Sequence, residues 1–189
     1  MKNNLPVIEE ITRKSGLTLL FYKKNLFKVR LKNFPDLSFE DLIRLNNFDH
    51  AFYNKKPSGS LSFIESIPKP LKSDFVDLWF FRVDGQRKLS RNDVIDLHIS
   101  NEIVGHPSLQ LSVNHTDVDF AKDFPTTAFW GNEKGFFHSI IHFSETKTIE
   151  GRNFDFRDCS PSCDMSGKEW YVGVDKHLSP KIFENYKRR

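Results

Sequence analysis

Apolar and polar residues follow a strand-like pattern along three runs between residues 74 and 116. The run 77–83 is rich in aromatic and β-branched residues, and the runs 93–100 and 108–115 alternate apolar with polar side chains. Because successive side chains of a strand point to opposite faces of its sheet, each alternating run would bury one face and leave the other polar. The pattern predicts three strands whose core residues are Ile95, Leu97, Ile99, Leu109, Leu111 and Val113.

The first 33 residues predict a helix followed by a β-hairpin. Residues 5–15 place acidic side chains in the first turn and basic ones in the last, and Gly16 follows as a stop signal. The apolar runs 17–22 and 26–32 are separated by Lys-Lys-Asn at 23–25, which predicts a hairpin turn. Three cations then share one face of the second strand, namely Lys28, Arg30 and Lys32.

A second helix is expected from residue 38 to about residue 52. It opens with Ser38-Phe39-Glu40-Asp41, which resembles a capping box with Asp in the place of Glu. Residues 54–60 contain two lysines with Pro, Gly and Ser, and predict an exposed loop.

The second half of the chain adds strands and a closing helix. The runs 136–144 and 169–174 predict strands, residues 150–168 predict an irregular segment, and Pro180 opens a helix that ends in basic residues. Together these segments predict a single α+β domain over residues 1–189. Its sheet should be mainly antiparallel with about seven strands, and its helices should lie near both termini and at about 38–52.

The composition fits one domain, and the charge is unevenly distributed. The 189 residues include 19 Phe and 2 Met, which indicates a core of aromatic rings. The net charge is +3, but residues 1–33 carry eight Lys and Arg against two Glu, and such a local excess can attract polyanions. No apolar run reaches the length of a membrane helix, so we expect no membrane partner and a cytoplasmic location, with Cys159 and Cys163 reduced.

The main functional hypothesis is nucleic-acid binding through the basic hairpin. Its candidate phosphate contacts alternate with aromatic residues such as Phe21, Tyr22 and Phe27, whose rings could stack on bases. The predicted contacts are Lys23, Lys24, Lys28, Arg30 and Lys32, with no cofactor.

A phosphodiester-cleaving enzyme is an alternative. His98-Ile99-Ser100 and His142-Phe143-Ser144 each end a predicted strand, and on a strand a His and the Ser two residues later point the same way. The pair resembles the paired His-x-Ser/Thr signature of the 2H phosphoesterases. The resemblance implies a metal-free site in which the two histidines act as base and acid. Its catalytic residues would be His98, Ser100, His142 and Ser144.

Two other classes stay open. Glu145-Thr146-Lys147 has the Glu-x-Lys spacing of metal-dependent nucleases, which would require Mg²⁺ and an upstream acid such as Asp117, Asp119 or Asp123. The other class is a protein-binding inhibitor or immunity-type module without catalysis, which would take a protein partner and whose surface no motif would reveal.

Overall fold

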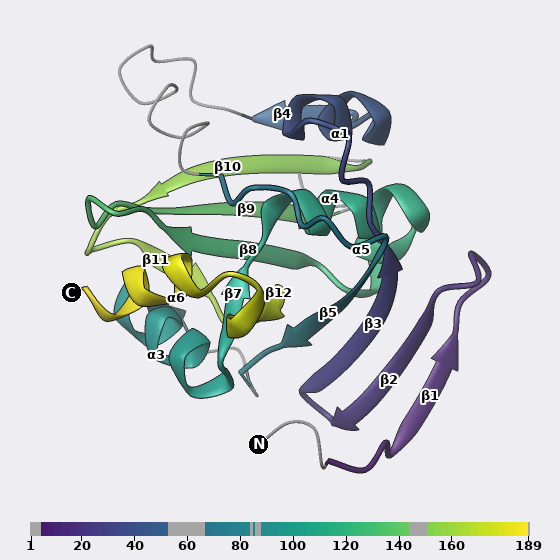
Figure 1. Cartoon of the computed structure of the whole chain (residues 1–189), viewed down its shortest axis with the longest axis horizontal. Coiled ribbons are helices and arrows are strands. Elements are labelled where there is room, and N and C mark those ends of the chain that lie inside the picture. Colours follow the sequence, from purple (N-terminus) through teal and green to yellow (C-terminus); the bar gives the residue numbers. More distant parts are fainter. Residues whose placement is uncertain (1–4, 53–66, 84, 86–87, 144–150, 189) are drawn as a thin grey trace.

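A mostly antiparallel sheet of ten strands forms the centre of the molecule (Figure 1). The computed structural model describes residues 5–52, 67–83, 85, 88–143 and 151–188. The strand order is β1-β2-β3-β5-β12-β8-β9-β10-β4, and β7 also pairs with β12. The pairs β12–β8 and β10–β4 are parallel, and the other described pairs are antiparallel. These strands are β1 Glu9–Thr12, β2 Thr18–Lys23, β3 Leu26–Lys32, β4 His50–Phe52, β5 Phe75–Phe81, β7 Ile103–Gly105, β8 Thr126–Gly131, β9 Phe137–Phe143, β10 Asn153–Cys159 and β12 Trp170–Asp175.

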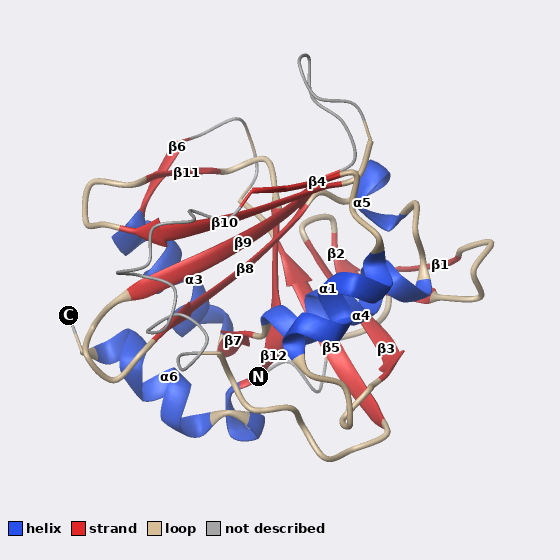
Figure 2. Ribbon diagram, turned by 90° about the horizontal axis from the view of Figure 1, so that it is seen from above, coloured by secondary structure: helices blue, strands red, loops and turns tan. Residues whose placement is uncertain are grey.

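Helices cover both faces of this sheet (Figure 2). Gln110 of α4 donates a hydrogen bond to Thr126 Oγ1 of β8 at 2.9 Å, whereas His98 of α3 packs against the ring of Phe129 in the same strand. Thr126 and Phe129 are three residues apart on one strand, so they point to opposite faces. The helices are α1 Phe39–Asn46, α3 Arg91–Asn101, α4 Pro107–Thr116, α5 Phe120–Asp123 and α6 Pro180–Lys187, and a 3-10 turn, η2, spans Lys176–Leu178.

The predicted α+β class is confirmed, but two of the three central runs form helices rather than strands. The run 77–83 lies mostly in β5, whereas 93–100 lies in α3 and 108–115 lies in α4. Ser90 and Asp93 cap α3 in a capping box, and Pro107 occupies the first turn of α4. These start signals outweigh the alternating pattern.

Helix α4 is buried on all sides along its first eight residues, which explains why its pattern resembles a strand. Residues 107–114 are all buried, the polar ones as well as the apolar ones, and two of the polar side chains bond within the helix: Ser112 donates to the carbonyl of Ser108, and Asn114 donates to the carbonyl of Gln110. A helix that has no solvent face carries no 3.6-residue polar period. Leu109, Leu111 and Val113 are buried as predicted.

The predicted N-terminal helix is wrong. Residues 9–12 instead form the edge strand β1, which pairs antiparallel with β2, and Gly16 adopts a positive φ of 84° in the turn between them. The four residues of β1 are exposed, so no apolar face is available to hold a helix on the core. β-Branched Ile11 and Thr12 suit a strand, and the neighbouring strand supplies the hydrogen bonds.

Other predictions are confirmed or corrected in detail. The hairpin β2–β3, the strands β9 and β12 and the closing helix α6 lie where expected, and the Ser38–Asp41 capping box is present. Helix α1 ends at Asn46 rather than near residue 52, because Asn47 adopts a left-handed conformation and β4 follows.

The sequence pattern does not predict strand β8. The segment 150–168, expected to be irregular, contains β10 and also β11, Asp164–Ser166, which pairs with β6, Lys88–Ser90. The predicted loop at 54–60 lies outside the described residues.

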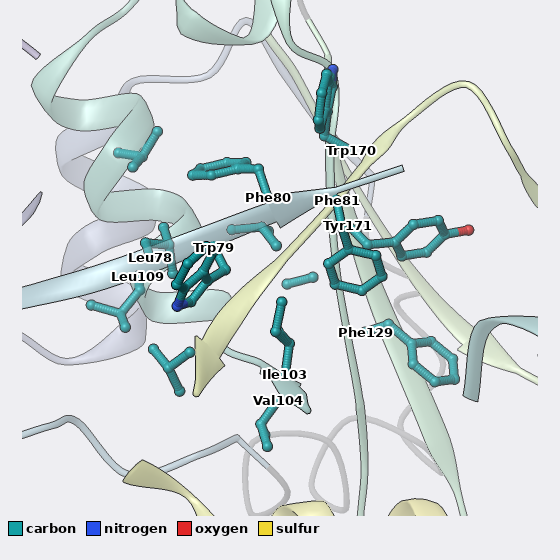
Figure 3. Packing of buried hydrophobic residues seen from close by; sticks show 14 of the residues in the cluster. Leu78, Trp79, Phe80, Phe81, Ile103, Val104, Leu109, Phe129, Trp170 and Tyr171 are labelled. Carbon is teal, nitrogen blue, oxygen red and sulfur yellow. The ribbon is translucent and has the colours of Figure 1, made fainter. Parts of the chain in front are cut away.

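The core is built mainly from aromatic and branched side chains of the central strands, several of which Figure 3 shows. Phe27 of β3 and Phe80 of β5 stack with ring centroids 4.5 Å apart. Phe81 and Tyr171 stack on the opposite face of the same sheet, with centroids 5.7 Å apart. Among the described residues, no helix is long and apolar enough to cross a membrane.

Candidate nucleic-acid interface

Strand β3 presents its cations on one face of the sheet, as the sequence predicts. Phe27, Val29 and Leu31 are fully buried on the side of α4 and α5. Because side chains alternate, the cations Lys28, Arg30 and Lys32 point to the other face. Lys23 and Lys24 lie at the hairpin end of the strand and are exposed.

A cleft of about 400 Å³ lies on this face, where β3 and β5 form its floor. Residues 71–73 and the turn η2 also line it, and Asp175 of β12 contributes its side chain. We call it the sheet-face cleft. The cations, the aromatic rings and the histidine among its lining residues are Lys28, Arg30, Lys72, Phe75, Trp79 and His177.

Aromatic rings accompany the cations in the cleft. Phe75 is 53% exposed, and the guanidinium carbon of Arg30 lies 5.8 Å from the centroid of its ring. Lys28 Nζ lies 5.6 Å from the ring of Trp79, which in turn contacts Tyr22 at 5.3 Å between centroids. Trp79 is buried, so Phe75 is the ring with surface left for a ligand.

Two of the basic groups are already paired. Lys28 Nζ donates to Asp77 at 2.9 Å, and His177 Nδ1 lies 2.7 Å from Asp175. Burial opposes the charged form of Lys28, but the hydrogen bond to Asp77, the charge of Asp77 and the contact with Tyr22 together outweigh burial and raise the lysine pKa. Arg30, Lys32 and Lys72 make no ion pair with any described residue, so their charges are available to a ligand.

The two histidines of the phosphoesterase hypothesis do not meet at one cleft. His142 lies directly opposite Thr126 in the β8–β9 pair and shares its face, whereas His98 packs against Phe129 on the other face. Both side chains are 0% exposed. The expectation that two neighbouring strands present these histidines together is therefore wrong.

Each histidine has a structural environment. His98 Nδ1 lies 3.0 Å from the carbonyl of Ile103. The pKa of His142 is lowered to about 3 by burial and by the nearby charge of Arg152. Ser100 is exposed on α3 and donates to the carbonyl of Leu97, and Ser144 lies outside the described residues. Catalytic roles for these four residues stay predictions that this geometry does not support.

Two of the three acids of the nuclease hypothesis, Asp117 and Asp123, bind a cation of the protein itself. The guanidinium of Arg13 donates to both Asp117 and Asp123, and these bonds raise the arginine pKa against the opposing effect of burial. Glu145 and Lys147 lie outside the described residues. Within the described ranges, no group of three His, Cys, Asp or Glu side chains is placed to hold a metal ion.

The two cysteines are free thiols. Cys159 is buried at the end of β10 and donates to Ser139 Oγ at 3.3 Å, and burial raises the pKa of its thiol to about 12. Cys163 is partly exposed in the turn that leads to β11.

Sequence reasoning missed four of the cleft residues named above, namely Lys72, Phe75, Trp79 and His177. The alternation along β5 could have identified Phe75 and Trp79, because these two residues and Asp77 alternate with buried Val76, Leu78 and Phe80. Lys72 and His177 come from segments far from the hairpin, and no local pattern links them to it.

Comparison with known proteins identifies no relative. The chain matches no protein-family model, and neither a curated protein nor a solved structure is significantly similar to it. The class that the fold and cleft define is therefore an α+β protein with a basic, aromatic cleft on one sheet face.

Proposed function

We propose that the protein binds single-stranded nucleic acid across the sheet-face cleft. The observation that carries the proposal is the pairing of Arg30 with the exposed ring of Phe75 on an open sheet face. Unpaired bases stack on aromatic rings, and cations beside those rings neutralise the phosphates between the bases.

The arrangement of charge supports an extended strand as the ligand rather than a compact molecule. Arg30 and Lys32 follow each other along β3, and Lys23 and Lys24 extend the basic surface to the hairpin end. At about 3.3 Å per residue, the span of β3 from Leu26 to Lys32 is about 20 Å, which is enough for several nucleotides. Lys72 adds a further cation at the cleft wall.

Binding of a fluorescent oligonucleotide, followed by anisotropy at several salt concentrations, tests the proposal. The double variant Arg30→Glu/Lys32→Glu should weaken binding strongly, by more than about tenfold at low salt, because two attractive charges become repulsive. Lys122→Glu is the matched control, since Lys122 is exposed on α5 at the other face of the sheet.

Two results would contradict the proposal. One is unchanged affinity in a folded Arg30→Glu/Lys32→Glu variant, which would exclude this face. The other is no binding to single-stranded DNA or RNA even at low salt, which would favour the class of protein-binding modules.

A further inference from the structure

A second basic pocket lies away from the sheet-face cleft. It has a volume of about 340 Å³ and is formed where α3 begins, where β8 turns into β9, and where α6 ends. Figure 1 shows these three places on the side of the molecule where the C-terminus lies. The residues used below are Arg91, Ile95, Glu133, Lys134, Phe137 and Arg188, and we call this site the α3–α6 pocket. It shares no lining residue with the sheet-face cleft.

The charges around this pocket favour an anion. Arg91, Lys134 and Arg188 come from three separate segments, and Glu133 is the one acid among the lining residues. None of the three cations forms an ion pair within the part of the chain that the structure describes. Three cations that line one pocket without an ion pair repel one another, and a bound anion would reduce that repulsion.

Arg91 supplies a second, independent indication. Its guanidinium carbon lies 5.4 Å from the centroid of the Phe137 ring, which holds the side chain against the pocket wall. Its Nε is buried and has no hydrogen-bond acceptor among the described residues. A buried donor without an acceptor is unfavourable, so a ligand oxygen at this position would be stabilising.

The helix end itself is not the feature that attracts the anion. Ser90 and Asp93 already satisfy backbone N–H groups at the start of α3 through their capping box. The side chains of Arg91, Lys134 and Arg188 therefore make the site.

We infer that the α3–α6 pocket binds a small phosphate ester that carries an apolar group. Guanidinium groups match phosphate oxygens in pairs, and a dianionic phosphate can engage several cations at once. Ile95 and the Phe137 ring provide an apolar wall for the rest of the ligand. The volume lies at the lower end of the usual range for small-molecule sites, about 300 to 1,000 Å³.

Isothermal titration of the full chain with phenyl phosphate tests this inference. Phenyl phosphate should bind saturably and more tightly than inorganic phosphate, because the ring adds contact with the apolar wall. Lys134→Gln and Arg188→Gln should each weaken binding by about fivefold to tenfold, since each removes one charge-assisted hydrogen bond. Both residues are exposed, so these variants should fold even if an Arg91→Gln variant does not.

Two controls locate the binding. Lys122→Gln, a cation outside both pockets described above, should leave the affinity unchanged. Arg30→Gln reports any contribution of the sheet-face cleft, because Arg30 lines that cleft and not the α3–α6 pocket. No saturable binding of phenyl phosphate at millimolar concentration, or binding that depends on Arg30 and not on Arg188, would overturn the inference. Phenyl phosphate binding is measured without an oligonucleotide, so this inference can fail or succeed separately from the proposed function.

Discussion

Lys28 Nζ donates a hydrogen bond to Asp77 Oδ2 at 2.9 Å, across the antiparallel pair of β3 and β5. This ion pair lies at the floor of the sheet-face cleft and neutralises one of its cations. The carboxylate also places a negative charge near the path by which a phosphate would approach Arg30, because Asp77 is the cross-strand partner of Arg30.

Removal of that carboxylate should therefore strengthen nucleic-acid binding. We expect Asp77→Asn to raise the affinity for a single-stranded oligonucleotide about threefold or more at low salt, and the gain should shrink as salt rises. Asp77 is partly exposed, so the loss of stability should stay below about 1 kcal/mol. Anisotropy measures the affinity and thermal unfolding measures the stability. A weaker complex in Asp77→Asn would mean that Lys28 must be held by Asp77 in order to bind.

Phe75 should contribute to binding in a way that salt does not change. Its exposed ring is available for stacking on a base, and a stacked base contributes about 1–3 kcal/mol. We expect Phe75→Ala to weaken oligonucleotide binding about tenfold or more, with the same slope of log affinity against log salt as the wild type, whereas Phe75→Trp should retain binding.

The matched comparison for Phe75 is a variant that removes charge alone. In Lys28→Gln/Arg30→Gln/Lys32→Gln the salt slope should become shallower by about one for each phosphate that the variant no longer neutralises. Anisotropy titrations across a salt series measure both slopes. A change of slope in Phe75→Ala would indicate that the variant had displaced Arg30.

The parts of the fold that the sequence predicts are those specified by local signals. The hairpin of β2 and β3 has alternating apolar residues on both sides of a turn, and Ser38 with Asp41 marks the start of α1 through backbone hydrogen bonds. Helix α4 has the pattern of a strand because its surroundings, not its own residues, decide that Gln110 and Asn114 are buried. Strand β1 depends in the same way on hydrogen bonds from β2.

The residues of the candidate site that the sequence predicts are likewise those that belong to one local segment. Lys28, Arg30 and Lys32 could be assigned to one face because they belong to one strand. His98 and His142 could not be placed, because whether two distant side chains share a face depends on the strand order and on which segments are helices. His177 lies in η2, far along the chain from the hairpin, so the pattern of the hairpin cannot predict that His177 lines the cleft.

Gly105 should tolerate no side chain. A Cβ at this position would lie 1.9 Å from the carbonyl oxygen of Phe129, where β7 runs beside β8. The obstacle is backbone, so it cannot rotate away. We expect Gly105→Ala to lower the free energy of unfolding by several kcal/mol or to prevent folding, whereas Gly85→Ala, with open space around its Cβ position, should cost only the strain of a positive φ, about 1–2 kcal/mol. Thermal unfolding of the two variants provides the comparison. Equal stability would show that β7 can move away from β8.

Tyr186 should stabilise the same junction through its hydroxyl group. Its Oη donates to the carbonyl of Phe129 at 2.6 Å and accepts from the backbone N–H of Gly105 at 3.1 Å, and burial raises the tyrosine pKa. Tyr186→Phe keeps the ring but leaves both backbone groups without this partner, which should lower the free energy of unfolding by about 1–3 kcal/mol. Tyr22→Phe is a matched control, because Tyr22 is only partly buried. A loss in Tyr186→Phe no larger than in Tyr22→Phe would mean that the buried hydroxyl of Tyr186 contributes no more to stability than a partly buried one.

His106 and His142 should make the folded state sensitive to mild acid. Burial lowers the pKa of His106 to about 4, and burial together with the charge of Arg152 lowers that of His142 to about 3. In the unfolded chain the pKa of each would be about 6.5, so below that pH the unfolded state binds protons that the folded state excludes. The stability that the two neutral histidines contribute is therefore fully present above about pH 6.5 and is lost as the pH drops toward their pKa values in the folded state. The free energy of unfolding should fall by about 2 kcal/mol per histidine between about pH 7.5 and 5.

The substitution His142→Leu should remove the part of the acid-induced loss of stability that His142 causes. Neither ring nitrogen of His142 has a hydrogen-bond partner among the described residues, and the ring packs edge-on against Phe48 with centroids 4.9 Å apart. An apolar side chain at position 142 should therefore change the free energy of unfolding by less than about 1.5 kcal/mol at about pH 7.5. Acidification to about pH 5 should then cost the variant about 2 kcal/mol less than it costs the wild type. Urea unfolding at the two pH values measures both quantities, and His177→Gln, a substitution at an exposed histidine, is the variant for comparison. If His142→Leu lost as much stability on acidification as the wild type, His142 would have to be protonated in the folded protein, and its position among buried side chains would need a charged partner.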